Sequence, residues 1–244
     1  MIYLLIPSYN DSYNFRPLLL NISGTLKRKN FKVIIINDGS TDNTKTIVKK
    51  FSKKYNLSLI GYKKNKGPGF AFKFGFQYLI PKLKNQDIVV TMEADNSSDF
   101  SILEKMIEKS RKYDIVLASP FAKNGQFIGL EFKRLVLGTA AVYLDRIIFP
   151  IKNVKTYSSF YRVYKAKILK SALSYYKENL IVENGFPAVI ELLIKLANLD
   201  AHICEVPSKL DWKSRRGKSK MKIGKTIIRH LSIYKNFLAG KYST

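Results

Sequence analysis

The sequence predicts an α/β protein with a mostly parallel central sheet flanked by helices, and three observations support this fold class. Short apolar runs rich in isoleucine, valine and leucine, typical of buried strands, alternate with longer amphipathic segments, typical of helices. Polar, turn-forming clusters follow several of these runs, as they do at the ligand-binding edge of parallel sheets. The hydrophobic content of 46% and the length of 244 residues suit one sizeable folded domain.

The expected elements follow from these patterns in chain order. Buried strands are expected at 2–6, 32–36, 57–61, 88–91 and 115–118, with helices between them at 13–29, 42–54, 69–83 and 100–112. Beyond these elements the alternation weakens, and we expect helices at 131–148, 166–176, 185–199 and 222–238 and one more strand at 203–206. The chain is therefore divided into one domain, 1–221, and a basic amphipathic C-terminal helix, 222–244.

The sequence shows no sign of secretion or of membrane spanning. Cys204 is the single cysteine, which excludes an internal disulfide and a thiolate metal cluster within one chain. The first residues lack the basic region of a secretory signal, and no stretch reaches the roughly 18 apolar residues of a spanning helix. We therefore expect a cytoplasmic protein, peripheral on the cytoplasmic face of a membrane.

The net charge is strongly positive, with 43 Lys and Arg residues against 18 Asp and Glu residues. Such a field attracts polyanions, so nucleic acid and an anionic membrane surface are both candidate partners, although part of the excess is explained equally well by compositional bias. A nucleic-acid-binding protein that contacts phosphate through 213–225 is one alternative function. It leaves Asp38, Glu93 and Asp95 unexplained, so no nucleic acid is expected.

Two acidic residues follow the fourth expected strand. Glu93 and Asp95 alternate at the strand end, so that Ala94 points away and both carboxylates can converge on one point. Two carboxylates suit a hard divalent cation when diphosphate oxygens and water complete its coordination. The ordinary alternative is a solvated turn, with Asp99 as the cap of the following helix.

Two further loops carry polar or glycine-rich motifs. Segment 38–42 (Asp-Gly-Ser-Thr-Asp) follows the second expected strand and opens a helix that Asp42 can cap, while Asp38 is placed to accept hydrogen bonds from a base or ribose. Segment 66–69 (Lys-Gly-Pro-Gly) precedes the next helix, where backbone N–H groups and Lys66 can meet phosphate.

These motifs, together with segment 7–11 (Pro-Ser-Tyr-Asn-Asp), resemble in order and spacing those of family 2 glycosyltransferases. The resemblance implies the GT-A fold, a nucleotide-diphospho-sugar-binding α/β domain. The later part resembles the dolichol-phosphate mannosyltransferase-like branch, whose members are polyprenyl-phosphate sugar transferases. That likeness depends on Arg162 after a serine-rich stretch, on segment 205–207 (Glu-Val-Pro) and on the basic segment 215–220. Together the likeness covers 1–221.

The resemblance implies a role for each matched position. The base and ribose of a sugar nucleotide would be surrounded by Pro7, Tyr9, Asp11 and Asp38, with Lys66 near the phosphates. Mg²⁺ or Mn²⁺ would be held against the diphosphate by Glu93, Asp95 and Ser97. A loop carrying Arg215, Arg216 and Lys220 would close over the phosphates, and an acceptor phosphate would be gripped by Arg134 and Arg162.

Four positions depart from the branch's usual pattern. Asp11 replaces a glutamate, and Glu93 replaces the aspartate that usually opens the acidic motif. Pro120 replaces a phosphate-binding arginine, and Thr156 replaces an aspartate. These departures keep open a family member that binds its ligands without catalysing transfer.

The implied reaction is the inverting, metal-dependent transfer of a sugar from a GDP- or UDP-sugar to a polyprenyl phosphate. Such an acceptor is already anionic and needs positioning rather than a strong base. Transfer to a hydroxyl of a cell-surface glycan is the alternative, with Glu183 as base; otherwise Glu183 is a favourable charge near a helix start. The last helix has one apolar face, which either packs on the domain or lies on an anionic membrane surface. A membrane-protein partner is also expected.

Overall fold

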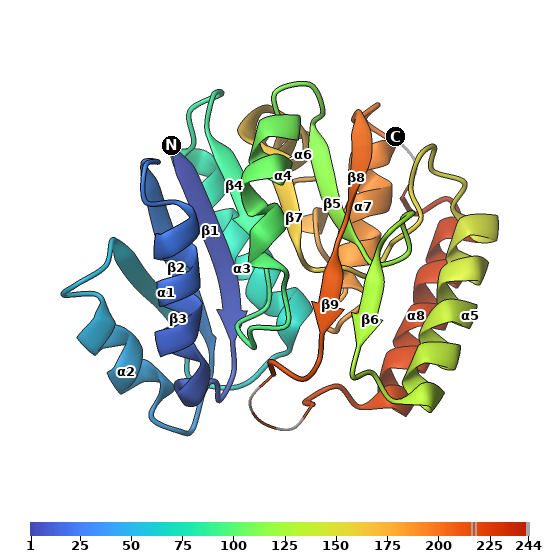
Figure 1. Ribbon diagram of the computed structural model, residues 1–244. Coiled ribbons are helices and arrows are strands. Elements are labelled where there is room, and N and C mark those ends of the chain that lie inside the picture. The colour runs from blue at the N-terminus through green and yellow to red at the C-terminus, as the bar shows by residue number, and fades with distance from the viewer. Residues whose placement is uncertain (216, 218, 243–244) are drawn as a thin grey trace.

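The computed structural model describes residues 1–215, 217 and 219–242 (Figure 1). The strands within this part of the chain are β1 Ile2–Ser8, β2 Phe31–Asp38, β3 Leu57–Tyr62, β4 Ile88–Thr91, β5 Ile115–Ser119, β6 Gln126–Ile128, β7 Arg162–Lys165, β8 Ile203–Pro207 and β9 Lys209–Asp211. The α-helices are α1 Phe15–Thr25, α2 Thr44–Phe51, α3 Pro68–Leu79, α4 Leu103–Lys109, α5 Phe132–Ile148, α6 Ala166–Tyr176, α7 Ala188–Ala197 and α8 Ile223–Leu238.

The central sheet is mostly parallel, which confirms the predicted fold class. Its seven strands have the order β3-β2-β1-β4-β7-β5-β8, and β6 pairs with β9 in a separate two-stranded sheet. All pairs are parallel except those of β7, which runs antiparallel to β4 and to β5. The sequence prediction missed β6, β7 and β9 because they are short and, unlike the equally short β4, contain charged or amide residues that interrupt the apolar run.

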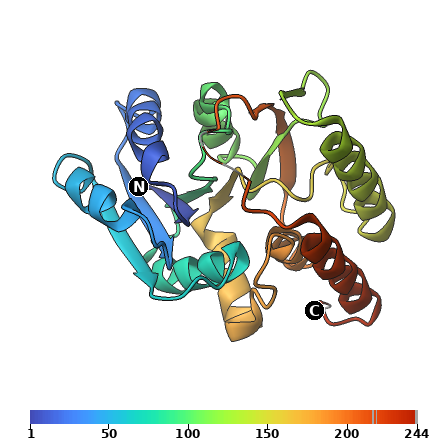
Figure 2. The ribbon, with the colours of Figure 1, turned by 90° about the horizontal axis from the view of Figure 1, so that it is seen from below.

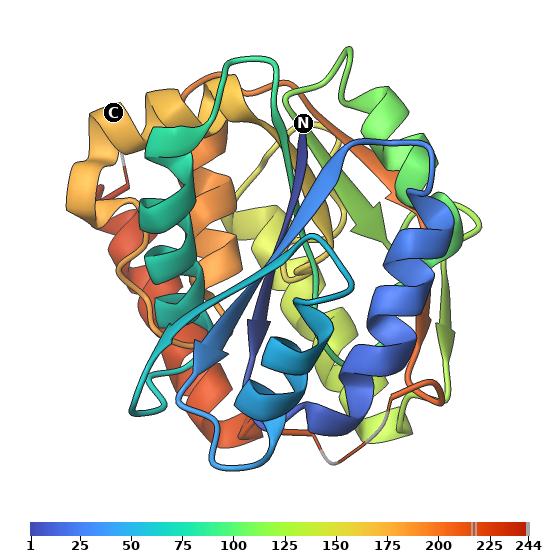
Figure 3. The same ribbon diagram turned by 90° about the vertical axis from the view of Figure 1, so that its left-hand side faces the viewer.

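Helices cover both faces of the sheet (Figures 1 and 3). Successive residues of a strand face opposite sides, so Leu4 and Ile6 of β1 pack with α1, α2 and α4, whereas Leu5 packs with α3, α6 and α7. All three leucine and isoleucine side chains are fully buried. Two apolar layers of this kind fix the register of the central strands and therefore the positions of the loops that leave them.

The helices occupy the predicted places but are generally shorter than predicted. The helix expected at 42–54 is α2, which begins at Thr44 because Asp42 lies outside it and accepts a hydrogen bond from the Thr44 backbone N–H at 2.9 Å. The helix expected at 100–112 begins as a 3₁₀ turn, Phe100–Ile102, after Asp99, whose carboxylate accepts from the Ser101 N–H at 3.1 Å. The cap expected at Asp99 is therefore confirmed, whereas the N-cap position of α2 is Asn43, and Asp42 lies one residue before it.

The helices α5 and α8 lie side by side at one end of the sheet (Figures 1 and 2). The buried Asp145 of α5 contacts His230 of α8 at 2.6 Å and accepts a hydrogen bond from the Tyr234 hydroxyl at 3.0 Å. Ile233 of α8 joins the core, so one face of this helix packs on the domain. In the described part of the chain, no helix has both the length and the apolar character needed to cross a membrane.

Candidate active site

The loops after β1, β2 and β4 meet at the carboxyl edge of the sheet, which is seen from below in Figure 2. A cleft of about 350 Å³ opens there, and we call it the main cleft. Its lining includes most of the residues expected to bind a nucleotide: Pro7, Tyr9, Asp11, Asp38, Glu93, Asp95, Arg215 and Lys220. The sheet topology thus brings together motifs that lie more than two hundred residues apart in the chain.

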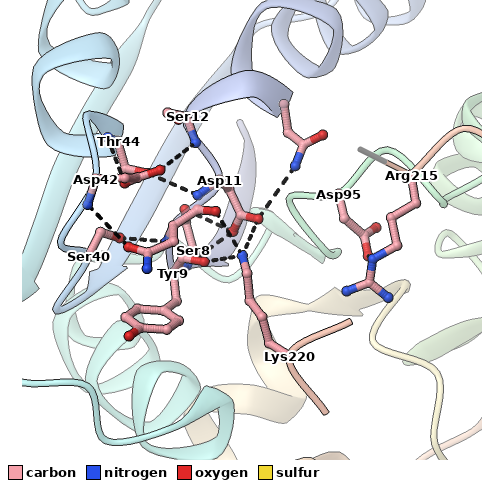
Figure 4. A network of polar contacts seen from close by, with 12 residues as sticks. Ser8, Tyr9, Asp11, Ser12, Ser40, Asp42, Thr44, Asp95, Arg215 and Lys220 are labelled. Carbon is pink, nitrogen blue, oxygen red and sulfur yellow. Dashed lines mark hydrogen bonds and ion pairs between the residues drawn. The ribbon is translucent and has the colours of Figure 1, made fainter. Parts of the chain in front are cut away.

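The loop after β1 is fastened by Asp11 (Figure 4). The Asp11 carboxylate accepts hydrogen bonds from the Tyr9 N–H at 3.0 Å and from the Ser8 hydroxyl at 3.2 Å, while its own N–H donates to the Thr44 hydroxyl at 2.9 Å. Asn10 adopts a positive φ of 53° and accepts from the Thr41 N–H at 2.8 Å. These bonds join the loops after β1 and β2 into one rigid wall of the main cleft.

Asp38, at the end of β2, holds the glycine-rich turn. Its buried carboxylate accepts hydrogen bonds from the backbone N–H groups of Lys66 at 2.7 Å and of Gly67 at 3.0 Å. Burial raises the pKa of Asp38, and these hydrogen bonds oppose the increase. Gly39 has a φ of +66°, and a Cβ there would lie 2.5 Å from the Asn65 nitrogen, so the turn needs glycine. The Lys66 ammonium lies 4.2 Å from the centre of the Phe70 ring, and its side chain is not part of the cleft lining.

β4 ends at Thr91, as expected, and Glu93 and Asp95 lie in the loop beyond it. Asp95 is nearly buried, and one of its oxygens accepts hydrogen bonds from the Ser97 hydroxyl at 2.6 Å and the Ser97 N–H at 3.1 Å. Its other oxygen lies 3.3 Å from Arg215 Nε. Burial, together with the negative charge of Asp95, raises the pKa of Glu93 to about 8, and Arg215 only partly opposes this.

This acidic loop fits a divalent cation that takes some of its ligands from a substrate. No group of three or more His, Cys, Asp or Glu side chains with metal-binding geometry occurs among the described residues. Mg²⁺ is often held by one or two carboxylates together with substrate phosphates and water. Glu93, Asp95 and the hydroxyl of Ser97 offer such a set of oxygen ligands.

The segment after β9 brings cations to this acidic edge. The Lys220 ammonium contacts the Tyr9 carbonyl and lies 2.5 Å from the Asp11 carboxylate, as Figure 4 shows together with Arg215 beside Asp95. The guanidinium of Arg215 also lies 5.1 Å from the centre of the Trp212 ring. Arg216, which was expected to act with them, lies outside the described residues.

A second cavity of about 300 Å³ lies between α5 and α8, and we call it the apolar groove. Its walls include Leu137, Gly138, Ala141, Ile190, Met221, Ile223 and Ile227. At its inner end it shares Glu93 and Arg215 with the main cleft. Arg134 of α5 lines the groove, and its guanidinium lies 5.2 Å from the Trp212 ring that Arg215 also approaches.

Arg162 is not a ligand-binding residue in this structure, which corrects the expectation that it grips an acceptor phosphate. Its side chain is fully buried. Its guanidinium donates hydrogen bonds to the carbonyl oxygens of Ser159 at 2.7 Å, Val189 at 2.7 Å and Tyr157 at 2.5 Å. Because its guanidinium donates to these backbone carbonyls, Arg162 supports the 157–159 segment instead of facing a substrate.

Glu183 does not have the surroundings of a general base. One of its carboxylate oxygens accepts hydrogen bonds from the Gly185 N–H and from Arg229 of α8, both at 2.6 Å. Glu183 also lies outside the linings of the main cleft and the apolar groove. The helix expected to start at Gly185 begins at Ala188, so Glu183 fixes the turn before α7 and contacts α8.

Sequence reasoning missed three aromatic residues of the site. Phe160 and Phe186 line both the main cleft and the apolar groove, and Trp212 lines the groove. Aromatic residues are common in this chain, so composition gave no signal for them. Trp212 is the chain's single tryptophan and precedes the basic segment, which is the one signal that was available.

Comparison with known proteins agrees with this geometry. The sequence model described as "Glycosyl transferase family 2" matches residues 3–173, so the chain belongs to glycosyl transferase family 2. A dolichol-phosphate mannosyltransferase of Pyrococcus furiosus is 29% identical over 93% of this chain and 60% of the relative. An undecaprenyl-phosphate mannosyltransferase of Micrococcus luteus is 23% identical over 83% of this chain and 80% of the relative. These relatives support the likeness to polyprenyl-phosphate sugar transferases.

A third relative, a poly-beta-1,6-N-acetyl-D-glucosamine synthase of Staphylococcus epidermidis, is 26% identical over 85% of this chain and 48% of the relative. The chain thus spans about half to three fifths of the length of this synthase and of the Pyrococcus relative.

Solved structures show the same fold. Glucosyl-3-phosphoglycerate synthase from Mycobacterium tuberculosis, crystallised with Mn²⁺, UDP-glucose and phosphoglyceric acid, superposes with a TM-score of 0.67 at 16% identity, covering 98% of this chain and 79% of the other. Residues 1–349 of TarS from S. aureus, in complex with UDP-GlcNAc, give a TM-score of 0.60 at 19% identity, covering 89% and 59%. The GT-A fold is therefore confirmed.

Proposed function

We propose that this protein transfers a sugar from a nucleoside-diphosphate sugar to a polyprenyl phosphate. The observation that carries the proposal is the meeting of two unlike cavities at Glu93 and Arg215. The main cleft is polar and lined by carboxylates and cations, whereas the apolar groove is lined mostly by aliphatic and aromatic side chains. A polar donor and a lipid acceptor would therefore meet beside the acidic loop.

The donor would bind in the main cleft, with its base and ribose beside Tyr9, Asp11 and Asp38. Its diphosphate would lie near Glu93 and Asp95, which with Ser97 would hold Mg²⁺ or Mn²⁺; the cation neutralises the charge that develops on the leaving group. Arg215 and Lys220 would then exchange their carboxylate partners for phosphate oxygens. The UDP-sugars bound in the neighbouring structures support this class of donor.

The acceptor would enter from the apolar groove. Arg134, on α5, is the described cation best placed to orient an acceptor phosphate that enters there, and the aliphatic walls suit the first isoprene units. No strong base is needed, because the phosphate is an anion at neutral pH, and direct attack would invert the anomeric carbon. The names of the Pyrococcus and Micrococcus relatives support this acceptor class.

Two of the departures from the branch pattern are compatible with this proposal. Thr156 and Ser119 share a hydrogen bond of 2.6 Å between their hydroxyls in the buried region beside Pro120. A neutral pair therefore occupies the place where the branch usually carries an aspartate, next to the position of its arginine. The lost arginine charge would be supplied by Arg134 and Arg215, which approach the same indole ring.

We also propose that the protein works on the surface of an anionic membrane. Outside the apolar groove, α5 and α8 expose large apolar side chains: Phe132, Val136, Tyr143, Leu144 and Ile147 on α5, and Ile228, Leu231 and Leu238 on α8. Lys225, Arg229 and Lys235 accompany the apolar residues of α8. A face of this composition suits the boundary between headgroups and acyl chains, where a polyprenyl phosphate resides. A membrane-protein partner on the same face is a further expectation.

The donor half of the proposal is tested by thermal unfolding with UDP, GDP and their common hexose conjugates, each with and without Mn²⁺. A nucleotide that binds the folded state raises the unfolding temperature. We expect stabilisation by at least one sugar nucleotide, and a larger effect with Mn²⁺ than without it. If no nucleotide stabilises the protein under either condition, the proposal is wrong.

A further inference from the structure

The apolar groove between α5 and α8 has two chemically different ends. At one end, beside the main cleft, Arg134 and Arg215 approach the same Trp212 ring at 5.2 and 5.1 Å. At the other end, His230 is the last residue of α8 in the lining. The side chains between the two ends are mostly aliphatic, so a ligand with an anionic head and an apolar tail would bind in one orientation.

A buried polar contact between the two helices closes the far end of the groove. Asp145 of α5 is fully buried, lies 2.6 Å from Nε2 of His230 and accepts a hydrogen bond from the Tyr234 hydroxyl at 3.0 Å. Ile233, the next buried residue of α8, packs in the core. Neither Ile233 nor Tyr234 lines the groove, which therefore ends at His230.

His230 also makes this end of the groove unfavourable for hydrocarbon. Its Nε2 contacts Asp145, whereas its Nδ1 has no hydrogen-bond partner within the described part of the chain. The side chain is 14% exposed, and Nδ1 is not one of the buried unpaired atoms of the described residues, so water reaches it. A hydrocarbon chain that passed over Nδ1 would displace this water without replacing the hydrogen bond, which costs free energy.

Two measures give the amount of hydrocarbon that the groove holds. The lining runs over 134–141 on α5 and 223–230 on α8, and each range spans about 10 Å at the rise of an α-helix. The four main-chain bonds of one isoprene unit span about 5 Å at the roughly 1.2 Å per bond of an extended chain, so two units fit. The volume agrees, because a cavity of about 150 Å³ holds the six carbons of benzene, and a groove of about 300 Å³ therefore holds roughly 12 carbons.

We infer that the protein recognises the phosphate and only the first two isoprene units of its acceptor, and that the contact between His230 and Asp145 sets this limit. The inference rests on the proposed function, which places the acceptor in the groove. The third and later units would leave the groove and lie against exposed apolar side chains of α5 and α8, such as Leu144 and Leu231. Geranyl phosphate, a water-soluble compound with two isoprene units, then carries every group that the groove recognises.

The test measures the binding of prenyl phosphates with 5, 10 and 15 carbons, without donor or cation. Trp212 is the chain's single tryptophan and lines the groove, so its fluorescence and calorimetry can both report binding. Burial of one CH₂ group tightens binding by roughly 4-fold. The dissociation constant should therefore fall by at least roughly 10-fold from dimethylallyl to geranyl phosphate, even with the second unit buried only in part. From geranyl to farnesyl phosphate it should change by less than about 3-fold, because the third unit lies outside the groove.

Ala141→Leu shortens the groove and leaves its polar end intact. Ala141 lines the groove one helical turn before Asp145, so a leucine there would occupy the space of the second isoprene unit. The gain in affinity from 5 to 10 carbons should be lost, and dimethylallyl phosphate should still bind. The matched control is Ala140→Leu, because Ala140 is exposed on the same helix and lies outside the lining; this variant should keep the gain.

His230→Ala tests the limit from the other direction. Without the imidazole, farnesyl phosphate should bind more tightly than geranyl phosphate by at least roughly 10-fold, because the third unit can enter the space that the ring leaves. The buried Asp145 would keep only the Tyr234 hydroxyl, so this variant should also be less stable. If His230→Ala does not fold, the comparison of Ala141→Leu with Ala140→Leu still decides the inference.

The outcomes separate this inference from the proposed function. A steady gain in affinity from 5 through 15 carbons in the wild-type protein contradicts the inference, as does an equal dependence on chain length in Ala141→Leu and Ala140→Leu. If no prenyl phosphate binds, both the inference and the proposed acceptor are wrong. If the prenyl phosphates bind with the expected limit at 10 carbons and no sugar nucleotide binds, the inference about the groove stands and the proposed function fails.

Discussion

Replacement of Arg162 by lysine should strongly lower the free energy of unfolding and leave the KM for the acceptor unchanged. Arg162 is fully buried, and three of its four hydrogen bonds reach carbonyl groups, those of Tyr157, Ser159 and Val189. A lysine keeps the charge, but its compact ammonium cannot span carbonyls of separate segments as a guanidinium does. If one of the three bonds survives, two charge-assisted bonds are lost, each contributing roughly 1.5–3 kcal/mol.

The expected loss is therefore about 3–6 kcal/mol, which is a large part of the 5–15 kcal/mol typical of a folded protein. Urea unfolding at equilibrium measures it, with Lys170→Arg on the surface of α6 as a control for the exchange of the two cations. Folded Arg162→Lys protein should keep its KM for the acceptor. A variant as stable as wild type but with a strongly raised acceptor KM would refute the structural role of Arg162.

Three further predictions concern the acidic loop and the outer helices. Asp95→Asn should abolish Mn²⁺-dependent turnover while changing the unfolding temperature little, and retained turnover would mean that the cation binds elsewhere. The pKa of Glu93 is raised to about 8, and a cation binds the ionised carboxylate, so the affinity for Mn²⁺ should rise by roughly tenfold or more between pH 6 and about pH 8, with release of protons. Calorimetry in two buffers measures the affinity and the proton release. Binding of Mn²⁺ that does not depend on pH would contradict the assignment of Glu93 as a ligand. Ile228→Glu on α8 should weaken sedimentation with vesicles containing phosphatidylserine, whereas Leu20→Glu on α1, also exposed, should not; equal effects of the two changes would argue against the α5–α8 face as the membrane contact.

The sheet and the placing of the three loops were predictable from sequence because they depend on long apolar runs. Residues 33–36 of β2, for example, are all buried, and such a run can hardly be anything but a central strand. Asp11, Asp38 and Asp95 then follow from where those strands end. The likeness to a known family supplied the chemistry that the topology alone does not give.

The second half of the site was less predictable because tertiary contacts decide it. Arg162 has the same local sequence whether it faces a phosphate or three carbonyls, and only the packing of Val189 against it distinguishes the two. The short strands β6 and β9 carry too little pattern to be recognised, yet their pairing holds the Trp212 backbone, whose N–H donates to the Ile128 carbonyl at 2.9 Å. The apolar groove depends on the meeting of α5 and α8, which Asp145 joins through His230 and Tyr234.

The meeting of a polar cleft and an apolar groove at Glu93 and Arg215 is tested most directly by filling the groove. Gly138 of α5 lines it, and a Cβ added there meets no atom within 4 Å, so Gly138→Leu should fold normally while occupying the groove. Gly24→Leu on α1 is the matched control, since a Cβ there also meets no atom within 4 Å and the residue is remote from the groove.

The measurement is Mn²⁺-dependent transfer of radiolabelled sugar from the preferred sugar nucleotide to a short polyprenyl phosphate in detergent. Wild type and Gly24→Leu should form the lipid-linked product, whereas Gly138→Leu should bind the donor with unchanged affinity and lose most of the transfer. Equal product formation by Gly138→Leu and Gly24→Leu, or no transfer to the polyprenyl phosphate by wild type, would contradict the proposed path of the acceptor to the acidic loop.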